Sequence, residues 1–422
     1  MEATRIRLAE GVHLTYLPAR KFKTSLLSAQ FVTPLRRETA GANALLAAVL
    51  RRGTVSCPDM GALSAKMDNL YDASIDYTVR KKGENQCVGF VARFIDDRDA
   101  PGGDRLLEPA AALLGELICD PVTYHGRFVP EYFESEKTNL LEAIRSLIND
   151  KRDWADSRLL RALCDGEAYA VPRLGDEETV DKLQALKVYT QYRDLISTAP
   201  LEIIYSGSAD LERVKQALAA AFATLPREEV RVISTAAPHV CRESVQYVED
   251  VLDVTQGKLG MGFSCGSDDM PALLMGNTLF GGSSNSKLFL NVREKLSLCY
   301  YASSLYHRQK GLITVSSGIE FQNYQRAYDE IMAQLEAVQK GELEDWELEG
   351  ARSTLLNSYA TVGDSQGKLE NFYLGQAATG QHETPADLAR AIQDMTAERI
   401  CRAMSTVKLD TVYFLKGKEV EA

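Results

Sequence analysis

Residues 71–77 read YDASIDY, and residues 300–306 read YYASSLY. Both fit the pattern Y-x-A-S-x-x-Y, and each is followed by a basic run that ends in Lys-Gly, at 82–83 and at 310–311. Self-similarity at a fixed offset, here with helical regions before and after each copy, is typical of an internal duplication. We therefore expect an α+β protein with two homologous domains. Each domain should hold a mostly antiparallel sheet with helices packed on one side, and a linker should join the two into a clamshell.

The length of 422 residues fits two or three domains of about 100–200 residues each. The stretch PREEVRVISTAAP, at 226–238, shows no helical period and separates two segments with the same order of elements. We predict a first domain at 1–225, a linker at 226–240 and a second domain at 241–422.

The spacing of apolar residues predicts where the helices and strands lie. Strands are expected at 12–17, 26–32, 201–206, 244–250, 257–264, 299–306, 311–318 and 412–415, with two more inside 71–94. Helices are expected at 41–52, 59–71, 104–119, 129–165, 209–224, 270–280, 286–296, 323–340 and 343–378.

Charge and composition exclude several classes of protein. The chain has 48 Lys+Arg against 59 Asp+Glu, a net charge of −11, so we expect neither a nucleic acid nor a membrane as partner. It has no uninterrupted apolar run long enough for a transmembrane helix, and its start does not read as a signal peptide. The eight cysteines are scattered without a C-x-x-C pair, which favours reduced thiols in the cytoplasm.

Catalytic motifs that depend on local spacing are missing from the sequence. No two of the five histidines are four residues apart, and there is no G-x-S-x-G string. The segment Gly281, Gly282, Ser283 and Ser284 has two interpretations: a flexible turn before a helix N-cap, or a mobile loop at the edge of a binding cleft. We expect no cofactor and no metal.

Residues 281–301, GGSSNSKLFLNVREKLSLCYY, resemble a motif of the pitrilysin/insulinase-type metallopeptidases, the inverzincins. That motif has a small-residue loop, then S-x-L-F, then R-E-x-x-G-L-x-Y. Arg293 and Tyr300 match its Arg and Tyr, and Ser297 replaces its glycine. The resemblance implies that Arg293 and Tyr300 bind the substrate backbone and support the tetrahedral intermediate. A guanidinium and a phenol are suitable hydrogen-bond donors for a developing oxyanion.

The first half resembles the zinc-binding half of the same family, but without its ligands. Aligned on Gly53-Thr54, the two zinc histidines of the family fall on Ala44 and Ala48, and its general-base glutamate falls on Ala47. The distal glutamate ligand falls on Ala143. Alanine neither binds zinc nor activates water, so we expect these positions to form a degenerate zinc site. The alternative interpretation is purely structural: a face of small residues that packs tightly on the sheet.

The resemblance is strongest to a zinc-less bacterial homologue encoded beside an active partner; some members of that group are named for elongation factor P modification. It implies a non-catalytic subunit of a heteromeric zinc peptidase, which binds unfolded peptide and supplies Arg293 and Tyr300 to a zinc-bearing homologous subunit. We expect no enzyme activity from the chain alone, and a homodimer in isolation is compatible with the sequence. The alternative is a peptide- or protein-binding scaffold with no proteolytic role. For Arg293 and Tyr300 themselves, the alternative to a role in substrate binding is a purely architectural one.

Overall fold

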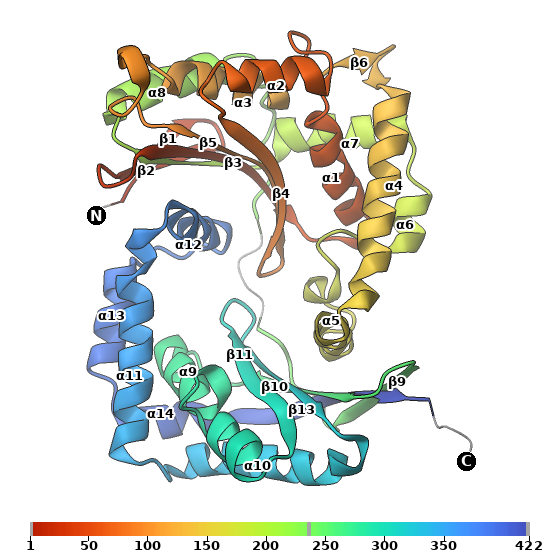
Figure 1. Ribbon diagram of the computed structural model, residues 1–422, viewed down its shortest axis with the longest axis vertical. Coiled ribbons are helices and arrows are strands. Elements are labelled where there is room, and N and C mark those ends of the chain that lie inside the picture. Colours follow the sequence, from red (N-terminus) through yellow and green to blue (C-terminus); the bar gives the residue numbers. More distant parts are fainter. Residues whose placement is uncertain (1–2, 234–237, 419–422) are drawn as a thin grey trace. The chain divides into compact units, whose positions relative to one another are not determined.

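The computed structural model describes residues 3–233 and 238–418, and the chain divides into two compact units (Figure 1). Unit 1 comprises Met1–Arg145, Val171–Thr235 and Gly363–His382, and unit 2 comprises Ser146–Ala170, Ala236–Val362 and Glu383–Ala422. Each half of the chain therefore gives one segment to the unit formed mainly by the other half. The predicted domains at 1–225 and 241–422 did not include this exchange. Within the predicted linker at 226–240, residues 234–237 lie outside the described residues.

Unit 1 is built on one large sheet. Its strands are β1 Thr4–Ala9, β2 Val12–Pro18, β3 Thr24–Pro34, β4 Ser74–Lys82, β5 Asn85–Ile95 and β8 Leu201–Gly207, with a separate hairpin of β6 Thr123–Tyr124 and β7 Arg127–Phe128. Its α-helices are α1 Arg37–Leu50, α2 Met60–Asp68, α3 Leu107–Cys119, α4 Pro130–Ser146, α6 Glu177–Asp181, α7 Ala185–Thr198, α8 Leu211–Ala221 and α12 Gln366–Ala378.

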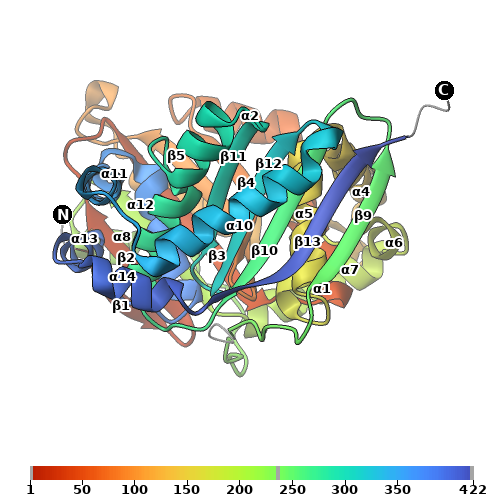
Figure 2. The ribbon, with the colours of Figure 1, turned by 90° about the horizontal axis from the view of Figure 1, so that it is seen from below.

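Unit 2 repeats this plan with fewer strands. Its strands are β9 Gln246–Leu252, β10 Gly257–Cys265, β11 Cys299–His307, β12 Leu312–Ile319 and β13 Val407–Gly417. Its α-helices are α5 Lys151–Leu163, α9 Met270–Asn277, α10 Tyr324–Lys340, α11 Asp345–Ala360, α13 Pro385–Gln393 and α14 Ala397–Met404, and two segments of π type are η4 Thr278–Gly282 and η5 Leu288–Lys295. Figure 2 shows α10 lying across the strands of this sheet.

The two sheets share one topology. Among the described residues, the strand order is β1-β2-β8-β3-β5-β4 in unit 1 and β11-β12-β10-β13-β9 in unit 2. Reversed, the order in unit 2 is β9-β13-β10-β12-β11, which corresponds strand by strand to β2-β8-β3-β5-β4 in unit 1. Each sheet has one parallel pair among the described residues, β9 with β13 in unit 2 and β2 with β8 in unit 1, and these pairs are at equivalent places. The repeated Y-x-A-S-x-x-Y string leads into β4 in one sheet and lies in β11 in the other, at equivalent edges. The predicted α+β fold with two mostly antiparallel, homologous sheets is thus confirmed.

Most helices of each unit pack on one face of its sheet, as predicted. In unit 1 the alternate residues Leu27, Ala29 and Phe31 of β3 face a core shared with α1, α3 and α7. In unit 2 the alternate residues of β10, among them Met261 and Phe263, face a core shared with α10. Alternation with period two places the intervening side chains on the opposite face of each sheet.

The opposite face of each sheet receives the exchanged helix, which the sequence did not predict. In unit 2, α5 packs on β10, where a Cβ atom at Gly262 would lie only 2.7 Å from Cδ2 of Leu163. In unit 1, α12 packs on β8 and β3, and its Gln366 side chain donates to the backbone oxygen of Ser206 at 2.8 Å. Each sheet is therefore covered on its second face by a helix from the other half of the chain.

None of the helices in the described ranges combines the length and the apolar content that a membrane crossing requires. The eight cysteines all lie in those ranges, and all are free thiols.

Candidate functional site

Three of the four degenerate zinc positions surround one pocket. The pocket has a volume of about 740 Å³ and lies between α1, α4 and the edge strand β4; we call it the β4 pocket. It is lined by Ala44, Ala48, Tyr77, Thr78, Val79, Arg80, Lys81, Lys82, Glu136, Asn139, Leu140, Ala143, Arg173, Leu174 and Asn371. Ala44 and Ala48 are one turn apart on α1, so their methyl groups share a face of the helix. Ala143 comes from α4, so the structure brings the three positions to a common space.

The fourth position, Ala47, lies elsewhere. Its side chain is fully buried, and it faces a small internal void together with Phe31 and Phe90 of the sheet. It does not belong to the lining of the β4 pocket. The alternative interpretation of small residues that pack on a sheet therefore describes Ala47 better than it describes Ala44 and Ala48.

The β4 pocket does not suit a metal ion. Among the described residues that line it, Glu136 is the one acidic side chain, and none is a histidine or a cysteine. Glu136 is itself held by Arg52, whose Nε donates to its Oε1. One carboxylate that is already paired cannot replace the three protein ligands of a catalytic zinc. We derive no zinc chemistry for this chain.

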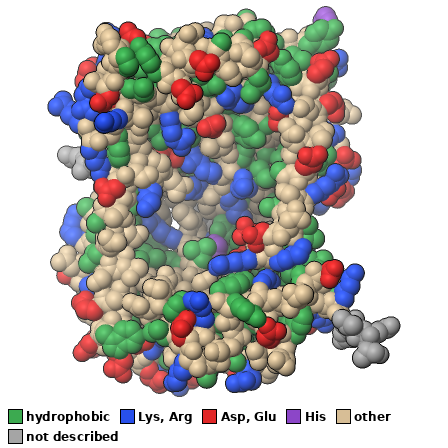
Figure 3. Space-filling model, in the orientation of Figure 1, with side chains coloured by type: hydrophobic (Ala, Val, Ile, Leu, Met, Phe, Trp, Pro, Cys, Tyr) green, Lys and Arg blue, Asp and Glu red, His purple; other side chains and the backbone are tan. Residues whose placement is uncertain are grey.

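The pocket carries positive charge instead. Arg80, Lys81 and Lys82 are consecutive on β4, and Arg173 lies in the loop before α6. Figure 3 shows Lys and Arg side chains gathered near the middle of this face, where β4 runs in Figure 1. In the sequence, the basic run serves only as a marker of the repeat. Its position on an edge strand was the available signal that these side chains would line a cleft.

Arg80 has a carboxylate partner inside the unit. Its Nη1 and Nη2 donate to Oε2 and Oε1 of Glu370, both at 2.6 Å. Glu370 also accepts a hydrogen bond from Ser28 at 2.7 Å, and its side chain is almost fully buried. This pair fixes the position of Arg80 against α12 and neutralises its charge.

Lys82 and Arg173 have only neutral partners among the described residues. The ammonium of Lys82 donates to the side-chain oxygen of Asn371 at 2.7 Å and to its backbone oxygen at 3.3 Å. Burial lowers the pKa of Lys82; the charge of Arg80 also lowers it, and the charge of Glu370 raises it. Arg173 donates through Nη1 to the backbone oxygen of Val79 at 3.1 Å, a carbonyl group of β4. Their charges are thus not cancelled by a carboxylate.

Arg293 and Tyr300 line a second pocket, which lies in unit 2 and has a volume of about 430 Å³. Arg293 extends from η5 with its guanidinium carbon 4.6 Å from the centre of the Phe289 ring. Tyr300 lies in β11 and is 62% exposed, and its hydroxyl donates to Oε1 of Glu320 at 2.7 Å. That hydrogen bond raises the pKa of Tyr300, so the phenol keeps its proton as a hydrogen-bond donor. We call this the Arg293 pocket.

Ser297, which replaces the glycine of the resembled motif, also lines the Arg293 pocket. Its φ is +50°, in the left-handed region that side chains with a Cβ rarely adopt. The position therefore suits the glycine of the motif, and serine is a less favourable residue there.

The predicted cleft loop does not line either of these pockets. Gly281 is buried at the end of η4, and a Cβ there would lie 2.7 Å from Oγ of Ser304 in β11. Ser283 donates to the backbone oxygen of Thr278 at 3.2 Å, while Gly282 and Ser284 are exposed. The segment is a compact connection between η4 and η5, and its role in a cleft stays a prediction.

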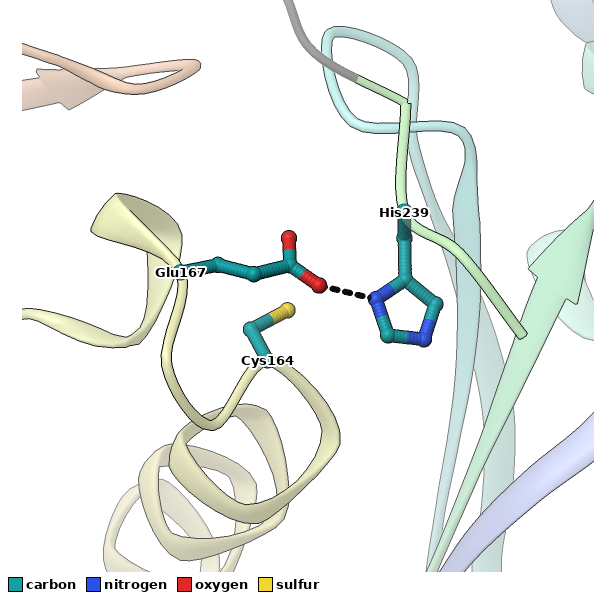
Figure 4. Close-up of side chains that lie close together, drawn as sticks. All are labelled: Cys164, Glu167 and His239. Carbon is teal, nitrogen blue, oxygen red and sulfur yellow. Dashed lines mark hydrogen bonds and ion pairs between the residues drawn. The ribbon is translucent and has the colours of Figure 1, made fainter. Parts of the chain in front are cut away.

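A cluster missed in the sequence lies in unit 2, where Cys164, Glu167 and His239 converge (Figure 4). One sulfur, oxygen or nitrogen atom of each lies within 4.8 Å of the others. His239 uses both ring nitrogens, because Nδ1 bonds Glu167 at 2.5 Å and Nε2 bonds Asp410 at 3.2 Å. The buried ammonium of Lys310 pairs with the other oxygen of Glu167. The cluster is therefore an ion-pair network, in which the carboxylate of Glu167 and both ring nitrogens of His239 are already engaged.

Comparisons with known proteins agree with the geometry of the β4 pocket. A family model described as "Peptidase M16 inactive domain" matches residues 182–355. The chain is 34% identical over 416 residues to "Probable inactive metalloprotease YmfF" of Bacillus subtilis, which covers 97% of this chain and 96% of that protein. It is 22% identical over 309 residues to "Uncharacterized zinc protease YmxG" of the same organism, which covers 70% of this chain and 72% of that protein. A crystal structure of a conserved protein from Enterococcus faecalis is 27% identical, covers all of both chains and has a TM-score of 0.91.

Proposed function

Because the chain belongs to the M16, pitrilysin-type, peptidase family as an inactive homologue, we propose that it is the peptide-binding, non-catalytic subunit of a heteromeric zinc peptidase. In this proposal Arg293 and Tyr300 reach the active centre of a zinc-bearing homologous subunit. The free cysteines fit a reducing compartment, and we place the complex in the cytoplasm.

One observation carries the proposal: a pocket that lacks metal ligands and a pocket that keeps two oxyanion donors occur in the same chain. Alanine occupies the positions where zinc chemistry would need imidazole and carboxylate. Arg293 and Tyr300 share the Arg293 pocket, where the Arg293 side chain is 40% exposed. The Tyr300 hydroxyl now donates to Glu320 and would exchange that hydrogen bond for one to the oxyanion. Donors that face a developing oxyanion are worth about 100- to 1000-fold in kcat each, which gives a reason to keep them when the metal site is lost.

Peptide binding would use the free edge of β4. This strand pairs only with β5 among the described residues, and in its outer row of backbone groups the oxygen of Val79 accepts from Arg173. The rest of that row is left for an added strand. Residues Tyr77–Lys82 of the same strand line the β4 pocket. An extended peptide that pairs with β4 would therefore place alternate side chains in that pocket.

The test is reconstitution with the zinc-bearing homologue that co-purifies with this chain from its native cell. We expect Arg293→Ala and Tyr300→Phe each to lower kcat about 100-fold, without loss of assembly. Arg326→Ala, at an exposed position of α10, is the matched control and should leave kcat unchanged. Full activity of both pocket variants in an assembled complex would refute the proposal.

A peptide-binding scaffold without a peptidase partner is the second candidate. It is favoured by the fact that the β4 pocket lies entirely within unit 1 and needs no other chain. Mass spectrometry of the native complex separates the two. Recovery of a chain with H-x-x-E-H supports the split peptidase, and recovery of this chain alone, with bound peptide, supports the scaffold.

A further inference from the structure

We infer that the β4 pocket selects peptides that carry carboxylates, so the ligand is an acidic extended segment. The inference rests on the proposed peptide binding and adds the chemical class of the peptide. It runs against the charge of the whole chain, because a protein with a net charge of −11 would be expected to attract basic peptides.

The first step is the balance of charge inside the pocket. Four of its lining side chains are cationic, and Glu136 is the one acidic residue among those described. Arg52 pairs with Glu136, and Glu370 pairs with Arg80, so these two ion pairs cancel. Of the other three cations, Lys82 and Arg173 have hydrogen bonds to neutral oxygen atoms only. The pocket therefore presents uncompensated positive charge.

The second step is where these two charges lie relative to an added strand. Lys82 ends β4, and the guanidinium of Arg173 touches the backbone oxygen of Val79 from outside the β4–β5 ladder. A peptide strand beside β4 would run past both groups. Arg173 is exposed, and its remaining N–H donors have no partner among the described residues, so a carboxylate can bind it in the two-pronged geometry that a guanidinium favours.

The third step is the space available. The methyl groups of Ala44, Ala48 and Ala143 leave a volume of about 740 Å³, which accommodates several side chains. Burial lowers the pKa of Lys82 even though the nearby Glu370 carboxylate raises it, and the ammonium itself bonds only to neutral oxygen atoms. A carboxylate from the peptide would supply that partner and remove part of the cost of burying the charge.

The test measures binding of labelled peptides to the full chain by fluorescence anisotropy. The probes are short peptides of alternating Thr and Glu, Thr and Gln, and Thr and Lys. We expect the Glu peptide to bind at least about tenfold more tightly than the Gln peptide, and the Lys peptide to bind more weakly than either. Added salt should reduce this preference, because it screens charges that are partly exposed.

Variants locate the preference. Lys82→Gln and Arg173→Gln should each reduce affinity for the Glu peptide about tenfold and leave the Gln peptide unaffected. Lys82→Arg should retain the preference, and Lys187→Gln, at an exposed position of α7 outside the pocket, should change nothing. Circular dichroism confirms that each variant is folded.

The outcomes separate this inference from the proposed function. Equal binding of the three peptides, or tighter binding of the Lys peptide, overturns the acidic preference and leaves peptide binding intact. Binding to none of them overturns both. A preference for Glu that survives Lys82→Gln and Arg173→Gln places the acidic site elsewhere and refutes its assignment to the β4 pocket.

Discussion

Arg80 and Glu370 form a two-pronged ion pair, with both N–O distances at 2.6 Å, although 290 positions separate them in the sequence. Arg80 belongs to the edge strand β4, and Glu370 belongs to the exchanged helix α12. The Glu370 side chain is 4% exposed and that of Arg80 is 22% exposed. The pair therefore joins α12, which comes from the second half of the chain, to the strand that borders the β4 pocket.

Glu370→Gln should lower the free energy of unfolding by about 3 kcal/mol, because it leaves the half-buried Arg80 without a counter-charge. Urea unfolding of the full chain measures this change. Asp364→Asn is a suitable control, because Asp364 pairs with Lys21 at the surface of the same unit, and we expect no measurable effect there. If the two variants behave alike, the pair does not hold α12 on the sheet.

A second ion pair holds the other exchanged helix, and it depends on pH. Arg158 of α5 binds Asp250 of β9 at 2.7 and 3.1 Å, and the Tyr413 hydroxyl donates to the same carboxylate at 2.9 Å. Burial by itself raises the pKa of Asp250, but the hydrogen bonds from Arg158 and Tyr413 outweigh it. The pKa therefore lies below its ordinary value of 3.8.

A carboxyl whose pKa is lower in the folded state stabilises the fold above its unfolded pKa, and this contribution is lost as the pH falls through the folded value. Asp250→Asn should therefore cost about 1 kcal/mol at neutral pH, and the difference from the native chain should shrink below pH 3.8. Denaturant unfolding between neutral and acidic pH measures it. Glu249→Gln, next along β9 and paired at the surface with Lys416, is the control and should have no measurable effect on stability at neutral pH.

The two exchanged helices are also where sequence reasoning failed. Apolar spacing predicted continuous helices at 129–165 and 343–378, but the structure interrupts each before the exchanged helix begins. The breaks are marked only by caps: the Asp150 carboxylate accepts from the N–H groups of Arg152 and Asp153, and Ser365 caps α12. Helical period persists through both breaks, so the choice between one helix and two depends on contacts far along the chain.

The candidate site divides in the same way. Alignment with a family motif identified Ala44, Ala48 and Ala143, and these three residues line one pocket. The sequence could identify them because helical spacing and a family motif are both local signals. The charge of that pocket was not anticipated. It depends on which of its cations find a carboxylate, and Glu370 comes from a helix that no local signal assigns to unit 1.

Ser297 allows a test of the turn between η5 and β11. Its φ of +50° costs about 1 kcal/mol or more for a residue with a Cβ, and glycine avoids this cost. Ser297→Gly should therefore raise the free energy of unfolding by about 0.5–1 kcal/mol, even though glycine makes the unfolded chain more flexible. Ser353→Gly, at an exposed position inside α11, should lower it by a similar amount. Destabilisation by both variants would show that Ser297 is not strained.

The degenerate positions allow the most direct test of the β4 pocket. The combined variant Ala44→His, Ala48→His and Ala143→Glu places two imidazoles one turn apart on α1 and a carboxylate across the pocket. Because these are the ligand types of a catalytic zinc site, we expect the variant to retain about one zinc ion per chain after dialysis, measured by plasma mass spectrometry.

The native chain should retain no zinc after the same dialysis. Cys164→Ser, added to the combined variant, should not reduce the zinc content; that result would exclude the cluster of Cys164, Glu167 and His239 as the zinc site. Adding Ala47→Glu should not create a peptidase, because Ala47 is fully buried against the sheet and a carboxylate there would be desolvated and remote from the pocket. If the variant binds no zinc although it is folded, the three positions do not face a common point. If Ala47→Glu produces hydrolysis, the helix is free to turn that side chain into the pocket.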